Sequence, residues 1–276
     1  ASNNTAIGAS ALLANTTGGG NTAVGVNTLD ANTTGQVNVA VGQGALGSNT
    51  TANYNVGIGV DALGANTTGE LNTSVGSLSL SANTTGANNI AVGYHALNGN
   101  TTGGANIGVG RGALFANTTA NHNTAVGYLS MASNTTGGDN VALGKATLTS
   151  NTTGESNVAV GSQALDANTT GLNNVGVGRQ ALDGNTTGSR NVAVGTNALD
   201  KNTTADNNTA VGDGALKTNT TGAKNVALGA DNMLLNTTGS NNVSLGYGAL
   251  QVNTTASDNT AVGDAALFNN TTCGNS

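Results

Sequence analysis

The sequence predicts an all-β fold, a parallel β-solenoid or flattened β-roll of sixteen coils, each made by one repeat of seventeen residues. Three observations predict this fold. The triplet Asn-Thr-Thr returns sixteen times, always at the same spacing of seventeen residues. Short β-branched segments alternate with Gly and Asn, a pattern typical of strands separated by turns. The chain has no proline, as expected where each backbone amide is needed for pairing between coils.

Sixteen repeats begin at Asn4 and follow one another, without insertion or deletion, to the repeat that begins at Asn259. Numbered from this Asn, position 2 is Thr, Val or Ile, position 3 is Ala, Gly or Ser, and position 4 is Val, Ile or Leu. Position 5 is Gly, position 8 is mostly small, position 9 is Leu or Met, and positions 12 to 14 are Asn-Thr-Thr, followed mostly by Gly or Ala. One repeat cannot bury its own apolar face, so stacked neighbours must supply the core. We therefore predict a single repeat array over residues 1–276, without separate caps.

The six remaining positions of the repeat, 6, 7, 10, 11, 16 and 17, accept any kind of side chain. They hold all twenty charged residues, both histidines, all four tyrosines and both phenylalanines. We expect them to face solvent at turns. Position 9 contrasts with them, since only Met131 and Met233 replace Leu there, and we expect it to be buried.

Two strands are expected in each repeat. The first covers the Asn-Thr-Ala-Val-Gly segment, such as residues 21–25, where Thr22 and Val24 point to one side and Ala23 points to the other. The second would run from the Ala-Leu pair toward Asn-Thr-Thr.

Position 3 is small in all sixteen repeats, so something must approach this strand closely. The neighbour is either the opposite wall of a thin roll or another chain. We favour another chain, because a roll this narrow buries little apolar surface by itself. The predicted interchain small-residue face contains Ala23, Ala40, Gly57, Ser74, Ala91, Gly108, Ala125, Ala142 and Ala159.

Asn-Thr-Thr matches the acceptor motif for N-glycosylation, and it also suits a ladder in which stacked Asn amides bond to each other. The two Thr never vary, although the glycosylation motif does not require this, and the equally invariant Asn of position 1 usually begins no such motif. A ladder explains both Asn rows, whereas glycosylation explains only one. The candidate glycosylation sites are Asn15, Asn32, Asn49, Asn66, Asn83, Asn100, Asn117, Asn134, Asn151, Asn168, Asn185, Asn202, Asn219, Asn236, Asn253 and Asn270.

The sequence offers no candidate catalytic, metal-binding or cofactor-binding residues, and we predict that the protein is not an enzyme. His95 and His122 lie in different repeats without a recurring carboxylate or serine partner, and we expect both to be solvated turn residues. The tyrosines and phenylalanines are too scattered to predict a binding patch. Cys273 replaces the small residue of the last corner, where we favour burial over a cross-link between chains.

Carboxylates share position 10 without forming a regular charged file. They are Asp30, Asp166, Asp183 and Asp200. The net charge of −6 and the seven scattered Lys and Arg residues give no basic face for nucleic acid. No apolar run approaches the roughly 20 residues that span a bilayer, so no membrane insertion is expected.

The segments 208–216 and 259–267, which read Asn-Thr-Ala-Val-Gly-x-x-Ala-Leu, resemble the Hep/Hag-type head repeats of trimeric autotransporter adhesins, the YadA-like group. The whole array is also similar to the Asn-Thr-Ala-Val-Gly…Asn-Thr-Thr-Gly repeats of bacterial and phage tail-fibre-like proteins. The resemblance implies a parallel β-roll, three chains side by side, and an adhesive or fibrous role at a cell or virion surface. The adhesin head repeats are typically shorter than the repeat of this chain and lack the Asn-Thr-Thr-Gly corner.

The leading hypothesis is thus a non-catalytic extracellular fibrous protein, an adhesin head or tail-fibre-like shaft whose partners are its own copies and a surface receptor or glycan. The alternative is a self-assembling filament subunit, with or without glycans, because the first and last repeats both follow the template and could stack on neighbouring molecules or continue into a longer chain. A more remote alternative is ice or crystal-surface binding by the threonines. The two Thr of each corner are adjacent, so we expect one exposed Thr file rather than two.

Overall fold

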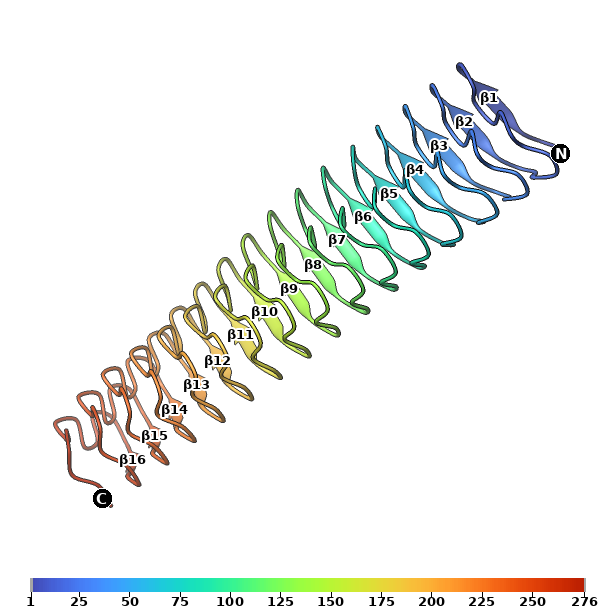
Figure 1. Cartoon of the computed structure of the whole chain (residues 1–276). Coiled ribbons are helices and arrows are strands. Elements are labelled where there is room, and N and C mark those ends of the chain that lie inside the picture. Colours follow the sequence, from blue (N-terminus) through green and yellow to red (C-terminus); the bar gives the residue numbers. More distant parts are fainter. Residues whose placement is uncertain (1, 276) are drawn as a thin grey trace. The chain divides into compact units, whose positions relative to one another are not determined.

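The fold is an all-β parallel solenoid, as the sequence predicts. A computed structural model describes residues 2–275, which form two compact units, a first unit up to Gly138 and a second unit from Asp139 onward. Within each unit the strands lie one above the next in sequence order (Figure 1). The single array over 1–276 stays a prediction. No helix long and apolar enough to cross a membrane occurs in residues 2–275.

Each coil contains one strand of three residues, at positions 2 to 4. The first unit holds β1 (Thr5–Ile7), β2 (Thr22–Val24), β3 (Val39–Val41), β4 (Val56–Ile58), β5 (Thr73–Val75), β6 (Ile90–Val92), β7 (Ile107–Val109) and β8 (Thr124–Val126). The second unit holds β9 (Val141–Leu143), β10 (Val158–Val160), β11 (Val175–Val177), β12 (Val192–Val194), β13 (Thr209–Val211), β14 (Val226–Leu228), β15 (Val243–Leu245) and β16 (Thr260–Val262).

Neighbouring strands pair in parallel, and each residue lies beside the equivalent residue of the next repeat. In the first unit Ile90 pairs with Ile107 and Ala91 with Gly108. The backbone outside the strands is paired in the same way, as in the bond from the Leu97 amide to the Ala113 carbonyl, 2.9 Å. Inter-coil hydrogen bonds therefore continue around the coil, beyond the short strands.

The expected second strand is wrong. Positions 7, 9 and 17 have positive φ in successive coils, as at His95 (57°), Leu97 (51°) and Ala105 (55°). A backbone that returns repeatedly to the left-handed region turns and cannot extend as a strand. The amide of Asn100 closes one of these turns by donating to the carbonyl of Leu97 at 3.1 Å.

The interior is filled mainly by Ala at positions 3 and 8 and by Leu or Met at position 9. From Leu29 to Leu250 the position-9 side chains have no exposed surface, which confirms the predicted burial. Left-handed geometry costs an L-residue about 1–2 kcal/mol, and full burial of a Leu side chain contributes about 1.5–3 kcal/mol. Burial is therefore large enough to offset the backbone cost at this position.

The invariant Gly of position 5 has a geometric cause. At Gly93 φ is 131°, a region open to Gly only, and an added Cβ would lie 2.7 Å from the carbonyl oxygen of Gly110 in the next coil. Any side chain there would separate the two coils.

The small-residue face of position 3 is also corrected. These residues are completely buried within a single chain, so they cannot form an interchain surface. A Cβ at Gly57 would lie 3.3 Å from Leu46 Cγ of the preceding coil and 3.1 Å from the carbonyl oxygen of Ala62. The opposite wall of the thin roll is the close neighbour. Thr22 and Val24 of β2 face away from Ala23, as predicted, and lie on the outer side of the coil.

Substitutions at Leu114 test the balance between burial and backbone strain. We expect Leu114→Ala to lower the free energy of unfolding by about 2–5 kcal/mol through cavity formation. Leu114→Met should cost less than about 1.5 kcal/mol, because Met conserves much of the volume. Leu114→Gly should be at least as stable as Leu114→Ala, since only Gly adopts positive φ without strain. Urea unfolding of the three variants checks this order, and a Gly variant clearly less stable than the Ala variant would contradict it.

Candidate functional surfaces

The Asn-Thr-Thr corner contains a ladder of buried amides. Asn100 Nδ2 donates to Asn83 Oδ1 of the preceding coil at 2.8 Å and to the carbonyl of Gly103 in its own corner at 2.9 Å. Asn117 Nδ2 in turn donates to Asn100 Oδ1 at 2.9 Å. The side chain of Asn100 thus uses both amide hydrogens and an acceptor lone pair. This is the predicted Asn ladder.

The Asn of position 1 forms a second ladder that is joined to the first. The backbone amide of Asn89 donates to Asn72 Oδ1 at 2.9 Å, and Asn89 Nδ2 donates to the carbonyl of Gly103 at 2.9 Å. The Gly103 carbonyl therefore accepts from Asn89 and from Asn100, which are the two Asn of one coil. These hydrogen bonds connect the start of the strand to the Asn-Thr-Thr corner of the same coil, and they connect both to the neighbouring coils.

The ladder contradicts the glycosylation interpretation of the Asn-Thr-Thr motif. The fourteen candidate Asn residues from Asn32 to Asn253 have no exposed surface, and only Asn15 and Asn270, in the outermost coils, are partly exposed. A glycan on Nδ2 would replace a buried ladder hydrogen and would have no room. In every coil except the two outermost ones, only one of the two Thr of the corner is fully exposed, as predicted. Thr101 is partly buried and donates to the Thr118 carbonyl at 3.0 Å, while Thr102 is exposed.

The ladder predicts that Asn100→Asp is strongly destabilising at neutral pH. The substitution preserves shape but removes two donors and places a buried charge against Asn83 Oδ1 and the Gly103 carbonyl. We expect a loss of about 3–5 kcal/mol, as for a buried charge without its partner. Urea unfolding at pH 7 measures this loss, and Thr102→Ser on the exposed side of the same corner is the control. Equal stability of the two variants would contradict the ladder's energetic role.

The outer face of each sheet carries two rows of aliphatic side chains. Position 4 is Val, Ile or Leu in every coil, yet Val92 is 38% exposed in the first unit and Leu228 is 44% exposed in the second. Position 2 is Val or Ile in ten coils and Thr in six, and Ile90 beside Val92 is 40% exposed. No charged residue occupies either row. Each unit therefore presents a periodic apolar face.

Three of the six aromatic side chains gather at one edge of the first unit, which corrects the expectation of scatter. Tyr94, Arg111 and Tyr128 occupy position 6 of three consecutive coils. The Arg111 guanidinium lies 5.7 Å from the centroid of the Tyr128 ring. The edge is hollowed into a groove of about 460 Å³, lined by Tyr94, His95, Arg111, Gly112, Phe115, Tyr128 and Leu129.

His95 is part of this groove and is not an isolated turn residue. Its ring meets the Tyr94 ring edge-on at 4.0 Å between centroids and lies 5.6 Å from the Phe115 ring. Its Nδ1 atom is buried without a hydrogen-bond partner. His122 occupies position 17 and does not line the groove.

The second unit has a different column, made of carboxylates at position 10. Asp166, Asp183 and Asp200 lie in consecutive coils, whereas we expected no regular file from the sequence. Burial, and then repulsion from Asp166 and Asp200, raises the pKa of Asp183, while Lys201 and a hydrogen bond from Gln180 lower it to a smaller extent. Lys201 Nζ pairs with Asp200 Oδ2 at 3.2 Å.

This column predicts that acidification stabilises the second unit locally. A carboxyl whose folded-state pKa is raised contributes stability at pH values below its unfolded pKa near 4, and that stability is lost as pH rises through the folded value. Asp183→Asn should therefore raise the unfolding midpoint at pH 7 and weaken its pH dependence. The gain should be under about 1 kcal/mol, because water screens the partly exposed Asp183. Urea unfolding at pH 4 and pH 7 checks both effects, with Asp258→Asn as the control, and a lower midpoint for Asp183→Asn at pH 7 would contradict the repulsion.

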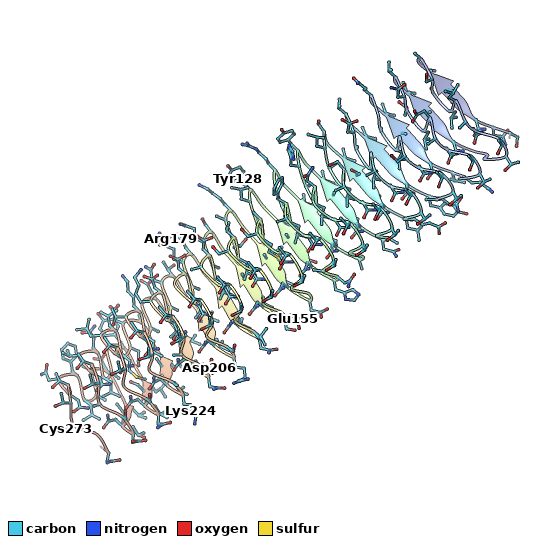
Figure 2. All side chains as sticks on the ribbon, in the orientation of Figure 1. Tyr128, Glu155, Arg179, Asp206, Lys224 and Cys273 are labelled. Atoms are coloured by element: carbon cyan, nitrogen blue, oxygen red, sulfur yellow. The ribbon has the colours of Figure 1, made fainter. Side chains whose placement is uncertain are left out.

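The remaining residues singled out from the sequence form no further site. Cys273 is exposed, so its predicted burial is wrong, and the alternative of a cross-link between chains is not tested. Among residues 2–275 no group of three His, Cys, Asp or Glu side chains is placed to hold a metal ion. Charged side chains are spread over both edges: Figure 2 shows Arg179 on one edge of the second unit and Glu155, Asp206 and Lys224 on the opposite edge.

Comparison of the chain with protein-family models, curated proteins and solved structures gives no match.

Proposed function

We propose that this chain is a non-catalytic extracellular structural protein, a fibrous element of surface attachment that associates laterally with copies of itself. The observation that carries the proposal is the aliphatic row at position 4. An exposed position that is open to water would accept Lys, Asp or Ser, as position 6 does, yet position 4 remains Val, Ile or Leu in all sixteen coils. A covering partner explains that restriction.

A second copy of the chain is the partner that fits this face best. The rows repeat at the strand spacing of about 4.8 Å, and an identical row is the surface that matches such a period along its length. Homo-oligomers with closed symmetry are the common outcome of self-complementary surfaces. The resemblance to adhesin head repeats favours three copies side by side. The face that we assign to the contact is the outer row of positions 2 and 4, in place of the buried position 3.

The proposal predicts a specific oligomer mass. Light scattering on the native chain should give three times 26.5 kDa, and Val75→Lys with Val109→Lys in the first unit should reduce the mass by placing charges in the contact. The charge-matched control is Ser77→Lys at position 6, where Lys145 already occurs.

Native mass equal to one chain at all concentrations, or an unchanged mass in the Val→Lys variant, would overturn the lateral contact. Mass that grows with concentration and is insensitive to the Val→Lys pair would instead support the filament alternative. Circular dichroism of each variant verifies that the coils remain folded.

A further inference from the structure

The groove at the edge of the first unit has the composition of a ligand site. Tyr and Phe are rare in this chain, six residues in 276, and Tyr94, Phe115 and Tyr128 all line this one hollow. All three are exposed, at 48%, 43% and 43%, although they contact His95 or Arg111. Exposed aromatic rings around a concave surface are typical of binding sites, because they offer large apolar faces with little flexibility.

Arg111 supplies the charge of the groove. Its guanidinium lies against the Tyr128 ring, and no carboxylate in residues 2–275 forms an ion pair with it. Arg190 differs, since it reaches Asp206 at 3.8 Å, and Arg179 donates to Gln180 Oε1 at 2.7 Å. Arg111 therefore retains donors for a ligand, and a planar guanidinium fork suits a carboxylate.

His95 adds a polar group beside the rings. Its Nδ1 is buried without a partner and is closed to a ligand, whereas its Nε2 forms no hydrogen bond within residues 2–275 and is the nitrogen that a ligand would contact. An imidazole nitrogen can donate to or accept from a ligand hydroxyl, depending on the tautomer.

We propose that this groove, built from Tyr94, His95, Arg111, Phe115 and Tyr128, binds a saccharide that carries a carboxylate. The apolar C–H faces of the sugar rings would stack on the tyrosines, the carboxylate would pair with Arg111, and a hydroxyl would bond to His95. Tyr94 and Tyr128 are two coils apart, about 10 Å at the usual strand spacing, so an extended oligosaccharide along the stack contacts both rings.

Charge complementarity favours this ligand over a polyanion. One guanidinium in the groove matches one carboxylate, whereas the net charge of −6 repels a chain of phosphates such as nucleic acid. A neutral sugar would satisfy the rings but leave Arg111 without an anionic partner. The inference does not depend on lateral self-association, because it concerns a single edge of one unit.

The test is titration of the full chain with two acidic probes that each carry one carboxylate, an aldotetraouronic acid (one glucuronic acid on a neutral trisaccharide) and sialyllactose, and with neutral lactose. NMR shifts of the tyrosine ring protons and calorimetry report binding. At least one acidic probe should bind, and lactose should bind at least about tenfold more weakly, since a charged hydrogen-bonded contact is lost. A preference between the two probes identifies the acidic sugar as a uronic acid or a sialic acid.

The matched variants are Arg111→Gln and Arg179→Gln, both at position 6, where Gln43 already occurs. Arg111→Gln should weaken binding of the acidic probe about tenfold or more, and Arg179→Gln should leave it unchanged. Tyr128→Ser, at a position that also holds Ser77, should weaken binding of both acidic and neutral sugars. No binding of either acidic probe at millimolar concentration would overturn the proposal, as would equal affinities for the two Arg variants. The mass of each variant by light scattering should equal that of the native chain. A loss of sugar binding can then be distinguished from a loss of the proposed lateral contact.

Discussion

The strict register of the repeat is the constraint on which the rest of the structure depends. An Asn amide can bond upward, downward and to its own corner only if an identical amide lies directly above and below it, as Asn83, Asn100 and Asn117 do. An inserted residue would move one amide away from its neighbours and leave buried donors and acceptors without partners, at about 1–3 kcal/mol each. The absence of any insertion across sixteen repeats follows from this requirement.

A polar interior also explains why the roll can be thin. The core has Ala at two positions and one Leu or Met per coil, which is little apolar volume for a domain of this size. The Asn rows and the backbone hydrogen bonds between coils fill the remaining space with satisfied polar groups. Such networks specify one arrangement, because a partly satisfied network is less stable than an apolar core. The burial of each Leu side chain then has to offset only the free-energy cost of that residue's own left-handed backbone conformation.

Periodicity alone was sufficient to predict the solenoid, the burial of position 9 and the Asn ladder. Two features are visible only in the structure. Positive φ at residues such as Leu97 follows from the path of the closed coil and has no local sequence signal, since Leu normally avoids that region. The neighbour of position 3 was assigned incorrectly. Alternation shows that positions 3 and 4 point apart and that position 3 must be small, but it does not tell whether the close neighbour is another chain or the opposite wall, and in the structure Leu46 of the same chain occupies the space beside Gly57.

The sequence predicts the groove when residues at the same position of successive repeats are compared. Tyr94, Arg111 and Tyr128 are each one repeat apart, so they are neighbours in the stack although they are distant in the chain. The Asp column at position 10 of the second unit follows the same rule. In a solenoid the side chains at one variable position of successive coils stack in a column. Such a position forms a binding site or a charged cluster only when successive coils carry side chains that attract or repel each other, because residues that are adjacent in the sequence point to different edges of the coil. A functional site in this architecture is therefore formed by side chains from several coils. The eleven restricted positions of the repeat can remain unchanged while the six variable positions differ from coil to coil.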